Sequence, residues 1–146
     1  MYKIKIEKIV IRTTGAFYHE FIGEKVKEIV AGAGIKTGSV TVMTTSTNGA
    51  VTVTENLECI ISDYQDLMSK LADYDGAYSH AHFLPTYGRT SANAYAHLRS
   101  LLTGNQTSFP ILDGKMAMGD AQDIVYFEWD GPQDRTVYVT VQGEDE

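Results

Sequence analysis

The sequence predicts an α+β domain, with helices packed on a mixed, largely antiparallel sheet. Three observations lead to this fold class. β-branched residues dominate 38–54 and 135–142, apolar residues recur with helical spacing over 57–71, and turn residues separate short strands near the C-terminal end. At 146 residues, with no internal repeat or low-complexity linker, the chain is predicted to form a single domain over 1–146.

The chain is predicted to begin with a strand and a helix. In YKIKIEKIVIR (2–12), apolar residues alternate with charged ones from Tyr2 and slip phase by Ile9, which indicates a bulged strand or two short strands. In AFYHEFIGEKVKEIVAGAG (16–34), apolar residues recur with helical spacing, and Gly34 favours a stop.

Strands and the clearest helix are predicted next. GSVTVMTTSTNGAVTVTEN (38–56) has the composition of strands, and its central TNG is either a turn or a place where the backbone closely approaches another segment. The apolar residues of 57–71 mark an amphipathic helix of about four turns.

A loop-like segment separates that helix from a second one over 91–105. The leucines of this second helix, at Leu98, Leu101 and Leu102, are expected to point inward, and Gly104 is expected to end it.

Two hairpins are predicted in the C-terminal third. Asp113-Gly114 lies between two apolar stretches, which is a strong local hairpin signal. DGPQD (130–134) separates DIVYFEW from RTVYVTVQG and predicts the second hairpin.

Charge and cysteine content narrow the function classes. The net charge of −7 and a pI near 5.0 argue against a nucleic-acid backbone or an anionic membrane surface as the main partner. The single cysteine, Cys59, excludes an internal disulfide and fits a reducing compartment. The N-terminus has no signal-peptide pattern, and no apolar run approaches the ~20 residues needed to cross a bilayer. A cytoplasmic protein is expected.

Two histidines are the first candidates for chemistry. His80 lies in a loop, two residues before His82, and His97 lies on the following helix. Imidazoles from a loop and an adjacent helix can converge as acid–base or metal-binding sites require. The alternative is that His97 is a core histidine satisfied by one hydrogen bond. On a helical wheel His97 falls with Asn93 and Ser100 at the edge of the leucine stripe, which favours the edge of a pocket.

Two carboxylates are also candidates. Glu55 stands where a strand gives way to the helix over 57–71. It either interacts with the helix dipole or places a carboxylate at a strand-to-helix junction, where sheet domains often bind ligands. Asp63 lies off the apolar stripe of the helix, so its side chain is expected to be exposed to solvent.

Short polar residues complete the candidate set. Ser46, Thr47, Asn48 and the backbone of Gly49 offer donors suited to an anion or a polar ring. Gln122, shortly after Gly119, can donate and accept through its amide. The sequence contains neither a P-loop nor a G-x-S-x-G elbow, and Cys59 is more typical of an inert helical cysteine.

These motifs together resemble a known family. From about Val40 to Gly143 the chain resembles the YjbQ-like proteins, also described as secondary thiamine-phosphate synthases. The resemblance lies in six motifs in register: GAVTVTEN, the aspartate of the following helix, YSH, NAYAHLRSLLTGN, FPILDGKMAMGDAQ and DGPQDRTVYVTVQGE.

The resemblance implies a set of site residues. It places the family's acid on Glu55, its helix aspartate on Asp63 and its histidines on His80 and His97, with Glu55, His80 and His97 as the catalytic residues. Substrate binding would fall on Ser46, Thr47, Asn48, Asn93, Gly119 and Gln122. His80 and His97 would hold a divalent metal, zinc or magnesium, if one is bound.

Two positions depart from the family pattern. Ser46-Thr47 stands where the family usually has a histidine–threonine pair, and Ala121 stands where a tryptophan usually precedes the glutamine. Serine is a poor zinc ligand, so Ser46 in place of the histidine is expected to weaken metal binding.

The resemblance also implies an activity and an assembly. The activity couples hydroxymethylpyrimidine pyrophosphate to thiazole phosphate and releases pyrophosphate, and the assembly is a homotrimer with clefts between subunits. Two alternatives stay open: a metal-assisted hydrolase of a small phosphorylated or acylated metabolite, and a non-catalytic trimer that binds a small anion. In each case the expected partner is a small anionic or phosphorylated metabolite.

Overall fold

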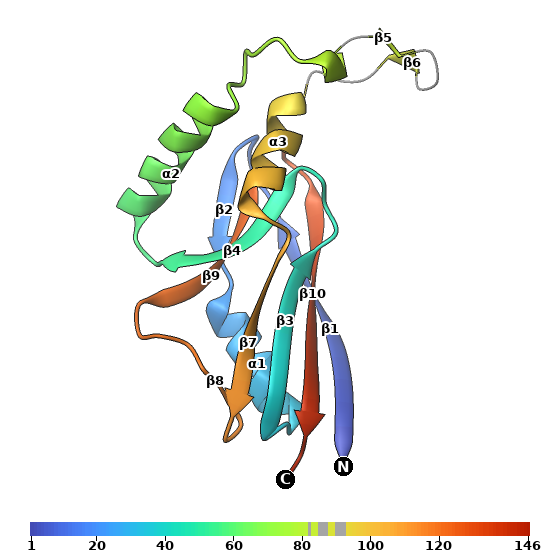
Figure 1. Cartoon of the computed structure of the whole chain (residues 1–146), viewed down its shortest axis with the longest axis vertical. Helices are drawn as coiled ribbons and strands as arrows, with labels where there is room; N and C mark the ends of the chain where they lie inside the picture. The colour runs from blue at the N-terminus through green and yellow to red at the C-terminus, as the bar shows by residue number, and fades with distance from the viewer. Residues whose placement is uncertain (82, 85–87, 90–92) are drawn as a thin grey trace.

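The computed structural model describes residues 1–81, 83–84, 88–89 and 93–146 (Figure 1). In chain order the elements are β1 (Tyr2–Arg12), β2 (Tyr18–Phe21), α1 (Gly23–Ala33), β3 (Thr37–Thr44), β4 (Gly49–Glu55), α2 (Glu58–Leu71), η1 (Ser79–Ala81), β5 (Phe83–Leu84), β6 (Gly88–Arg89), α3 (Ala94–Thr103), β7 (Gln106–Leu112), β8 (Lys115–Met116), β9 (Gln122–Glu128) and β10 (Asp134–Glu144).

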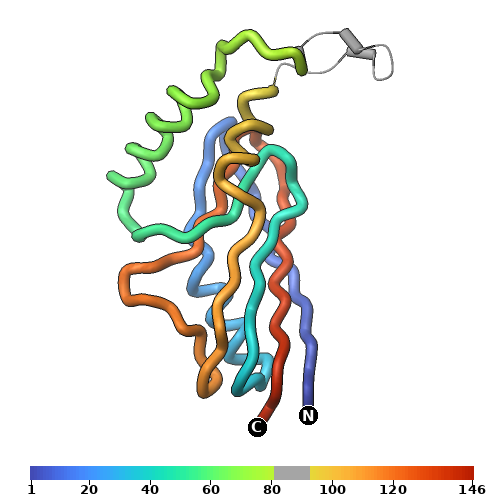
Figure 2. Tube along the Cα trace, viewed as in Figure 1, coloured from blue at the N-terminus to red at the C-terminus, as the bar shows by residue number. Residues whose placement is uncertain are grey.

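The strands form two main sheets in which every described pairing is antiparallel. The larger sheet has the order β1-β10-β3-β7-β8, and the smaller has the order β2-β9-β4. β1 and β10 pair along their whole length, so the two termini lie side by side at one end of the molecule (Figure 2). The α+β class predicted from the sequence is confirmed, and its sheets are antiparallel.

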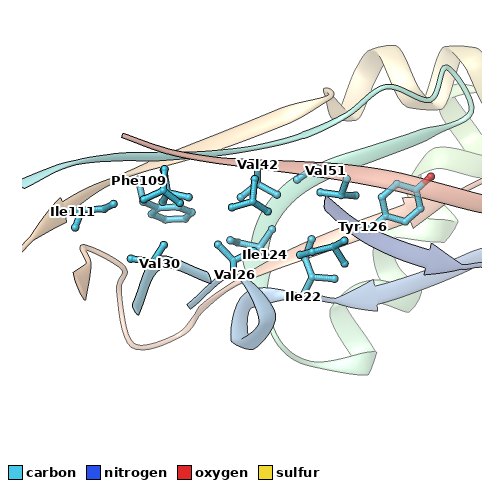
Figure 3. Close-up of a cluster of buried hydrophobic side chains, with 14 of the residues drawn as sticks. Ile22, Val26, Val30, Val42, Val51, Phe109, Ile111, Ile124 and Tyr126 are labelled. Atoms are coloured by element: carbon cyan, nitrogen blue, oxygen red, sulfur yellow. The ribbon is translucent and has the colours of Figure 1, made fainter. Parts of the chain in front are cut away.

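The main core lies between the five-stranded sheet on one side and α1 with the three-stranded sheet on the other. Val42 and Phe109 from the larger sheet meet Val26 of α1 and Ile124 of β9 (Figure 3). These side chains are between 0% and 6% exposed. Burial of apolar surface on this scale is the main favourable contribution to folding.

The predicted bulge in the N-terminal strand is wrong. β1 pairs with β10 in unbroken register from Tyr2 to Arg12. The alternation of apolar residues changes phase along β1 because the apolar residues of its first half lie on one face of the strand and those of its second half lie on the other. Ile4 is 61% exposed on the outer face, whereas Ile9 and Ile11 are buried in the core.

The helix predicted over 16–34 begins later than expected. Tyr18–Phe21 forms β2 and pairs with Val125–Glu128 of β9, so tertiary pairing overrides the helical spacing in this segment. α1 starts at Gly23 and ends before Gly34, whose φ of 71° lies in the left-handed region and confirms the predicted stop.

One predicted hairpin is confirmed and the other is wrong. Asp113 and Gly114 have φ values of 51° and 78° and join β7 to β8. The DGPQD segment does not form a hairpin, because β9 belongs to the three-stranded sheet and β10 to the five-stranded one. A buried ion pair spans this crossover: Arg135 Nε donates to Glu128 Oε1 at 2.6 Å, and Arg135 Nη2 donates to Glu128 Oε2 at 3.0 Å.

The leucines of α3 do not point inward, contrary to the prediction. Leu98, Leu101 and Leu102 are 37%, 79% and 58% exposed. The buried face of α3 instead consists of Ala94, Tyr95, Ala96 and Arg99. On α2 only Ile61 and Met68 are buried. None of the described helices is long and apolar enough to cross a membrane.

Candidate functional site

The structure brings His80 and His97 together. His80 lies in the short helix η1 and His97 in the second turn of α3, and both side chains are half-buried. Their ring centroids are 4.9 Å apart, with an angle of 68° between the ring planes. This edge-to-face contact joins two of the three predicted catalytic residues.

A hydrogen bond fixes the orientation of the His97 ring. Its Nδ1 lies 3.0 Å from the carbonyl oxygen of Thr47. A carbonyl oxygen only accepts, so Nδ1 carries the hydrogen and donates. In the neutral ring Nε2 is therefore the nitrogen with a lone pair, and this nitrogen can accept a proton or bind a metal.

A cavity of about 500 Å³ lies beside His97. We call it the histidine pocket, and it lies between α3 and the loop that joins β3 to β4. Its lining is formed by Ser46, Thr47, His97, Ser100, Leu101, Gly104 and Asn105. Hydroxyl, amide and imidazole groups are therefore available to a polar ligand, and Leu101 adds an apolar wall. His97 is thus a pocket residue rather than a core histidine.

Internal hydrogen bonds hold the loop of the histidine pocket in place. The Asn48 N–H donates to Ser46 Oγ at 3.0 Å, and the Asn48 carbonyl accepts from the Trp129 N–H at 2.9 Å. Ser100 on α3 donates to the carbonyl of Gly49. The side-chain oxygen of Asn48 is buried and has no hydrogen-bond partner in the described part of the chain. The loop is built as a rigid wall with one unsatisfied acceptor.

Asn93 has a positioning contact at the start of α3. It occupies the N-cap, and its Nδ2 donates to Asp130 Oδ2 at 2.8 Å. Asp130 follows β9, so this bond ties the beginning of α3 to the crossover between the two sheets. The contact orients the helix that carries His97.

Glu55 lies far from the histidines within one chain. It is the last residue of β4, where it faces Gln122 across the β4–β9 pairing. Ser100 contacts Gly49, at the other end of the same strand. Six strand residues at about 3.3 Å each separate the two ends by about 20 Å. The predicted site residues are therefore divided between the two ends of β4.

Gly119 and Gln122 belong to a different cavity. The Gly119 N–H donates to Gln122 Oε1 at 2.9 Å, and both residues line a cavity of about 430 Å³ beside α1. Lys27 and Met118 also line it. Asp63 lines a third hollow, between α2 and β4. None of these residues is part of the lining of the histidine pocket.

The described donors only partly fit a resident metal. No group of three or more histidine, cysteine, aspartate or glutamate side chains gathers in the residues that the structure describes. Zinc sites use at least three protein ligands, and the His80–His97 pair provides two imidazoles. His82 lies outside the described residues. Metal binding at His80 and His97 stays a prediction.

Sequence reasoning missed Arg99 and Tyr95. Arg99 is 2% exposed, donates from Nε to the Ala72 carbonyl at 3.0 Å, and its guanidinium lies 5.0 Å from the Tyr95 ring centroid. Burial lowers the pKa of Arg99, and burial raises the pKa of Tyr95 to about 12. Through Ala72, Arg99 ties α3 to the segment leading to His80. Tyr95 and Arg99 are four residues apart and therefore lie on the same face of α3, which could have indicated that they contact each other. Because an arginine is rarely buried, this face was not predicted to be the buried one.

Comparisons with known proteins agree on one family. The model of a family described as UPF0047 protein YjbQ-like matches residues 7–144. A UPF0047 protein from Archaeoglobus fulgidus is 36% identical over 102 residues, covering 70% of this chain and 75% of that protein. A UPF0047 protein from Methanothermobacter thermautotrophicus is 26% identical over 142 residues, covering 97% of this chain and 94% of that protein.

Solved structures give the same result. A crystal structure of a YbjQ-like protein of unknown function from Sulfolobus solfataricus superposes with a TM-score of 0.90 at 26% identity, covering 99% of this chain and 100% of that one. A hypothetical protein from Aeropyrum pernix superposes with a TM-score of 0.86 at 26% identity, covering 96% of this chain and 99% of that one.

Proposed function

The chain belongs to the YjbQ-like UPF0047 family, and from that premise we propose that it is a transferase of thiamine-phosphate-synthase type. In this reaction a pyrimidine pyrophosphate joins a thiazole phosphate and pyrophosphate is released. The observation that carries the proposal is the His80–His97 contact, together with the cavity of about 500 Å³ that His97 lines with Ser46, Thr47, Ser100 and Asn105. A pair of imidazoles next to hydroxyl and amide groups suits a phosphorylated ligand.

The histidines act on the leaving group in this proposal. The bond between the pyrimidine methylene carbon and the pyrophosphate oxygen breaks, and its electron pair leaves with pyrophosphate. The thiazole nitrogen donates its lone pair to the methylene carbon, which forms the new C–N bond. Negative charge grows on the departing oxygen, and a protonated imidazole, donating from Nε2 of His97, would stabilise it.

The position of Glu55 shapes the proposed assembly. Within one chain Glu55 lies at the opposite end of β4 from the histidine pocket. The resemblance implies a homotrimer with clefts between subunits, and we propose this assembly here. It is the arrangement in which an acid from one subunit would reach the histidines of another. The leaving-group role of His80 and His97 does not depend on it.

Ser46 favours a second candidate function, the binding of a small anion without turnover. Ser46 stands where the family usually has a histidine, and its hydroxyl already accepts a hydrogen bond from the Asn48 N–H. A pocket that kept its shape but lost one imidazole would still bind phosphate. Replacing Ser46 with histidine would then create an activity that the natural chain lacks.

The two candidates are separated by turnover of the two named substrates, followed by chromatography of the product. If the transferase proposal holds, the natural protein forms thiamine phosphate, and His97→Asn lowers the rate about 10²-fold or more, the usual size of a lost acid–base group. Asparagine retains an N–H donor for the Thr47 carbonyl but lacks the second nitrogen, so the fold is preserved. The matched control is Glu24→Gln, an exposed change on α1.

Other outcomes decide against the transferase. Turnover that is unchanged in His97→Asn would refute the role of the histidine pair. If the natural protein binds pyrophosphate in calorimetry without forming product, and Ser46→His forms product, the anion-binding function is supported instead.

A further inference from the structure

Two serine hydroxyls line the histidine pocket, and each has already used its hydrogen inside the chain. Ser46 lies on the wall formed by the loop between β3 and β4, and Ser100 lies on the wall formed by α3. Both residues are half-buried. A serine oxygen has one hydrogen to donate and two lone pairs that accept. What each serine offers a ligand therefore depends on where its hydrogen goes.

A buried carboxylate sets the direction of hydrogen bonding beneath Ser46. Glu128 is fully buried and accepts from Arg135 Nε at 2.6 Å and from the Asp130 N–H at 3.1 Å. Tyr126, which belongs to the main core (Figure 3), lies with its hydroxyl 3.3 Å from Glu128 Oε1. Because a carboxylate only accepts, Tyr126 donates its hydrogen to Glu128. The phenol oxygen of Tyr126 can then only accept from other groups.

The Ser46 hydroxyl supplies the hydrogen that Tyr126 accepts. The Tyr126 hydroxyl lies against Gly49, at the end of the loop that carries Ser46, where an added Cβ would collide with it. Burial raises the pKa of Tyr126 above its ordinary value and Glu128 adds to the rise, whereas a side-chain hydrogen bond with Ser46 opposes it. A hydrogen bond that lowers the pKa of a phenol is one that the phenol oxygen accepts. Ser46 is therefore the donor.

Only a lone pair remains on each serine oxygen for a ligand. Ser46 Oγ accepts from the Asn48 N–H at 3.0 Å, and the Ser46 N–H donates to Thr44 Oγ1 at 3.2 Å, so both donors of Ser46 are occupied. Ser100 donates its hydroxyl hydrogen to the Gly49 carbonyl. The two oxygens can accept a hydrogen bond from a ligand in the pocket but cannot donate one to it.

We propose that Ser46 and Ser100 determine specificity in the histidine pocket by accepting hydrogen bonds from an amino group of the ligand. An amino group on an aromatic ring has two N–H donors, one for each serine oxygen. A phosphate offers acceptor oxygens, so it is disfavoured at these two positions and suits the donor at Nε2 of His97. The inference rests on the proposed function for its ligand, because the aminopyrimidine ring of the proposed substrate carries such a group.

The arrangement of the pocket wall agrees with this ligand. Thr47 follows Ser46 directly, and its carbonyl holds the His97 ring through Nδ1 at 3.0 Å. Ser46 and His97 line the same cavity, so an acceptor and an imidazole are both available to one small molecule. In the proposed substrate the amino group and the methylene that carries pyrophosphate are bonded to adjacent ring atoms. One ligand therefore brings N–H donors and an anionic group into the pocket together.

The test compares two ligands by calorimetry, with no thiazole phosphate present: the 4-aminopyrimidine pyrophosphate and its 4-oxo analogue. The analogue has a carbonyl acceptor in place of the amino group. The natural protein should bind the amino ligand about 10-fold more tightly, because the carbonyl leaves the serine oxygens without a donor. Ser46→Ala and Ser100→Ala should each lower this preference to about 3-fold or less, since one of two acceptors is lost. Ser69→Ala, which removes an exposed serine hydroxyl from α2, is the matched control and should keep the full preference.

Tyr126→Phe tests the direction of the hydrogen bond at Ser46. It removes the oxygen that accepts from Ser46 and changes no residue that lines the pocket. The Ser46 hydrogen can then turn toward the ligand and donate to the oxo carbonyl, so the preference for the amino ligand should fall as it does in Ser46→Ala. Glu128 keeps both of its hydrogen bonds to Arg135 in this variant.

Equal affinities of the natural protein for the two ligands, or binding of neither, would overturn the inference. A full preference in both serine variants or in Tyr126→Phe would do the same. The ratio of the two affinities is the readout, because a loosened loop would weaken both ligands alike. Circular dichroism checks each fold, and if one serine variant is unfolded the other decides. Failure of the transferase proposal is seen separately, as no product from a protein that keeps the amino preference when thiazole phosphate is added.

Discussion

The imidazole of His97 is tied to the backbone of Thr47, because its Nδ1 donates a hydrogen bond to the Thr47 carbonyl over 3.0 Å. This bond joins α3 to the loop between β3 and β4, the two walls of the histidine pocket. It also leaves Nε2 as the nitrogen for chemistry. Stability and chemistry at His97 therefore depend on different atoms of one ring.

Substitutions that keep or remove the Nδ1 donor should separate these two roles. His97→Asn retains a donor for the Thr47 carbonyl and should unfold in urea at nearly the natural midpoint. His97→Leu removes the donor and should lower the free energy of unfolding by about 1 kcal/mol, the usual net value of such a bond. Equal midpoints for the two variants would show that the bond contributes nothing to stability.

The ion pair of Glu128 and Arg135 should be costly to break from one side. Glu128 is 0% exposed and Arg135 is 18% exposed. Arg135→Met leaves a buried carboxylate without its partner and should lower the free energy of unfolding by about 3–5 kcal/mol in urea titrations. The double variant Glu128→Leu, Arg135→Met removes both charges and should recover much of that loss. A double variant less stable than Arg135→Met would contradict this account.

Alkaline pH should destabilise the protein through Tyr95. Burial raises the pKa of Tyr95 to about 12, above its ordinary value of 10.0. Between these values the unfolded chain loses the phenol proton while the folded chain keeps it, so stability is intact below pH 10 and falls as pH rises toward 12. Urea midpoints of Tyr95→Phe should fall less steeply over this range than those of the natural protein. Identical slopes would mean that Tyr95 titrates normally in the fold.

Two glycines should respond in opposite directions to alanine. A Cβ on Gly49 would collide with the hydroxyl of Tyr126 and lie 2.7 Å from the Phe127 carbonyl. Gly49→Ala should therefore lower the melting temperature by several degrees, in line with a loss of about 1–3 kcal/mol from overpacking. A Cβ on Gly32 in α1 meets nothing within 4 Å. Gly32→Ala should raise stability by about 0.5–1 kcal/mol, because alanine favours helix more than glycine does. If calorimetry gives the same melting temperature for the two variants, both expectations are contradicted.

The histidine site was predictable in part. His97 was predicted at the edge of a pocket and lines one in the structure, although the leucine stripe used for that prediction is exposed. The sequence motifs placed Glu55 in one site with His80 and His97, but the position of Glu55 relative to the histidines in the folded chain could not be predicted from them. A motif gives the order of residues along the chain, but β4 runs about 20 Å between its ends at the strand rise of about 3.3 Å per residue.

The sequence by itself determined the local structure of this protein: the α+β class, the helix over α2, the turn at Asp113-Gly114 and the helix stop at Gly34. These depend on backbone preferences and on side-chain periods that act within a few residues. Only the tertiary structure decided which faces are covered. Leu98 and Leu101 are exposed while Arg99 is buried, and β9 and β10 lie in different sheets although five residues separate them. A period shows that a helix or strand has an apolar side, whereas the partner that covers one side comes from distant parts of the chain.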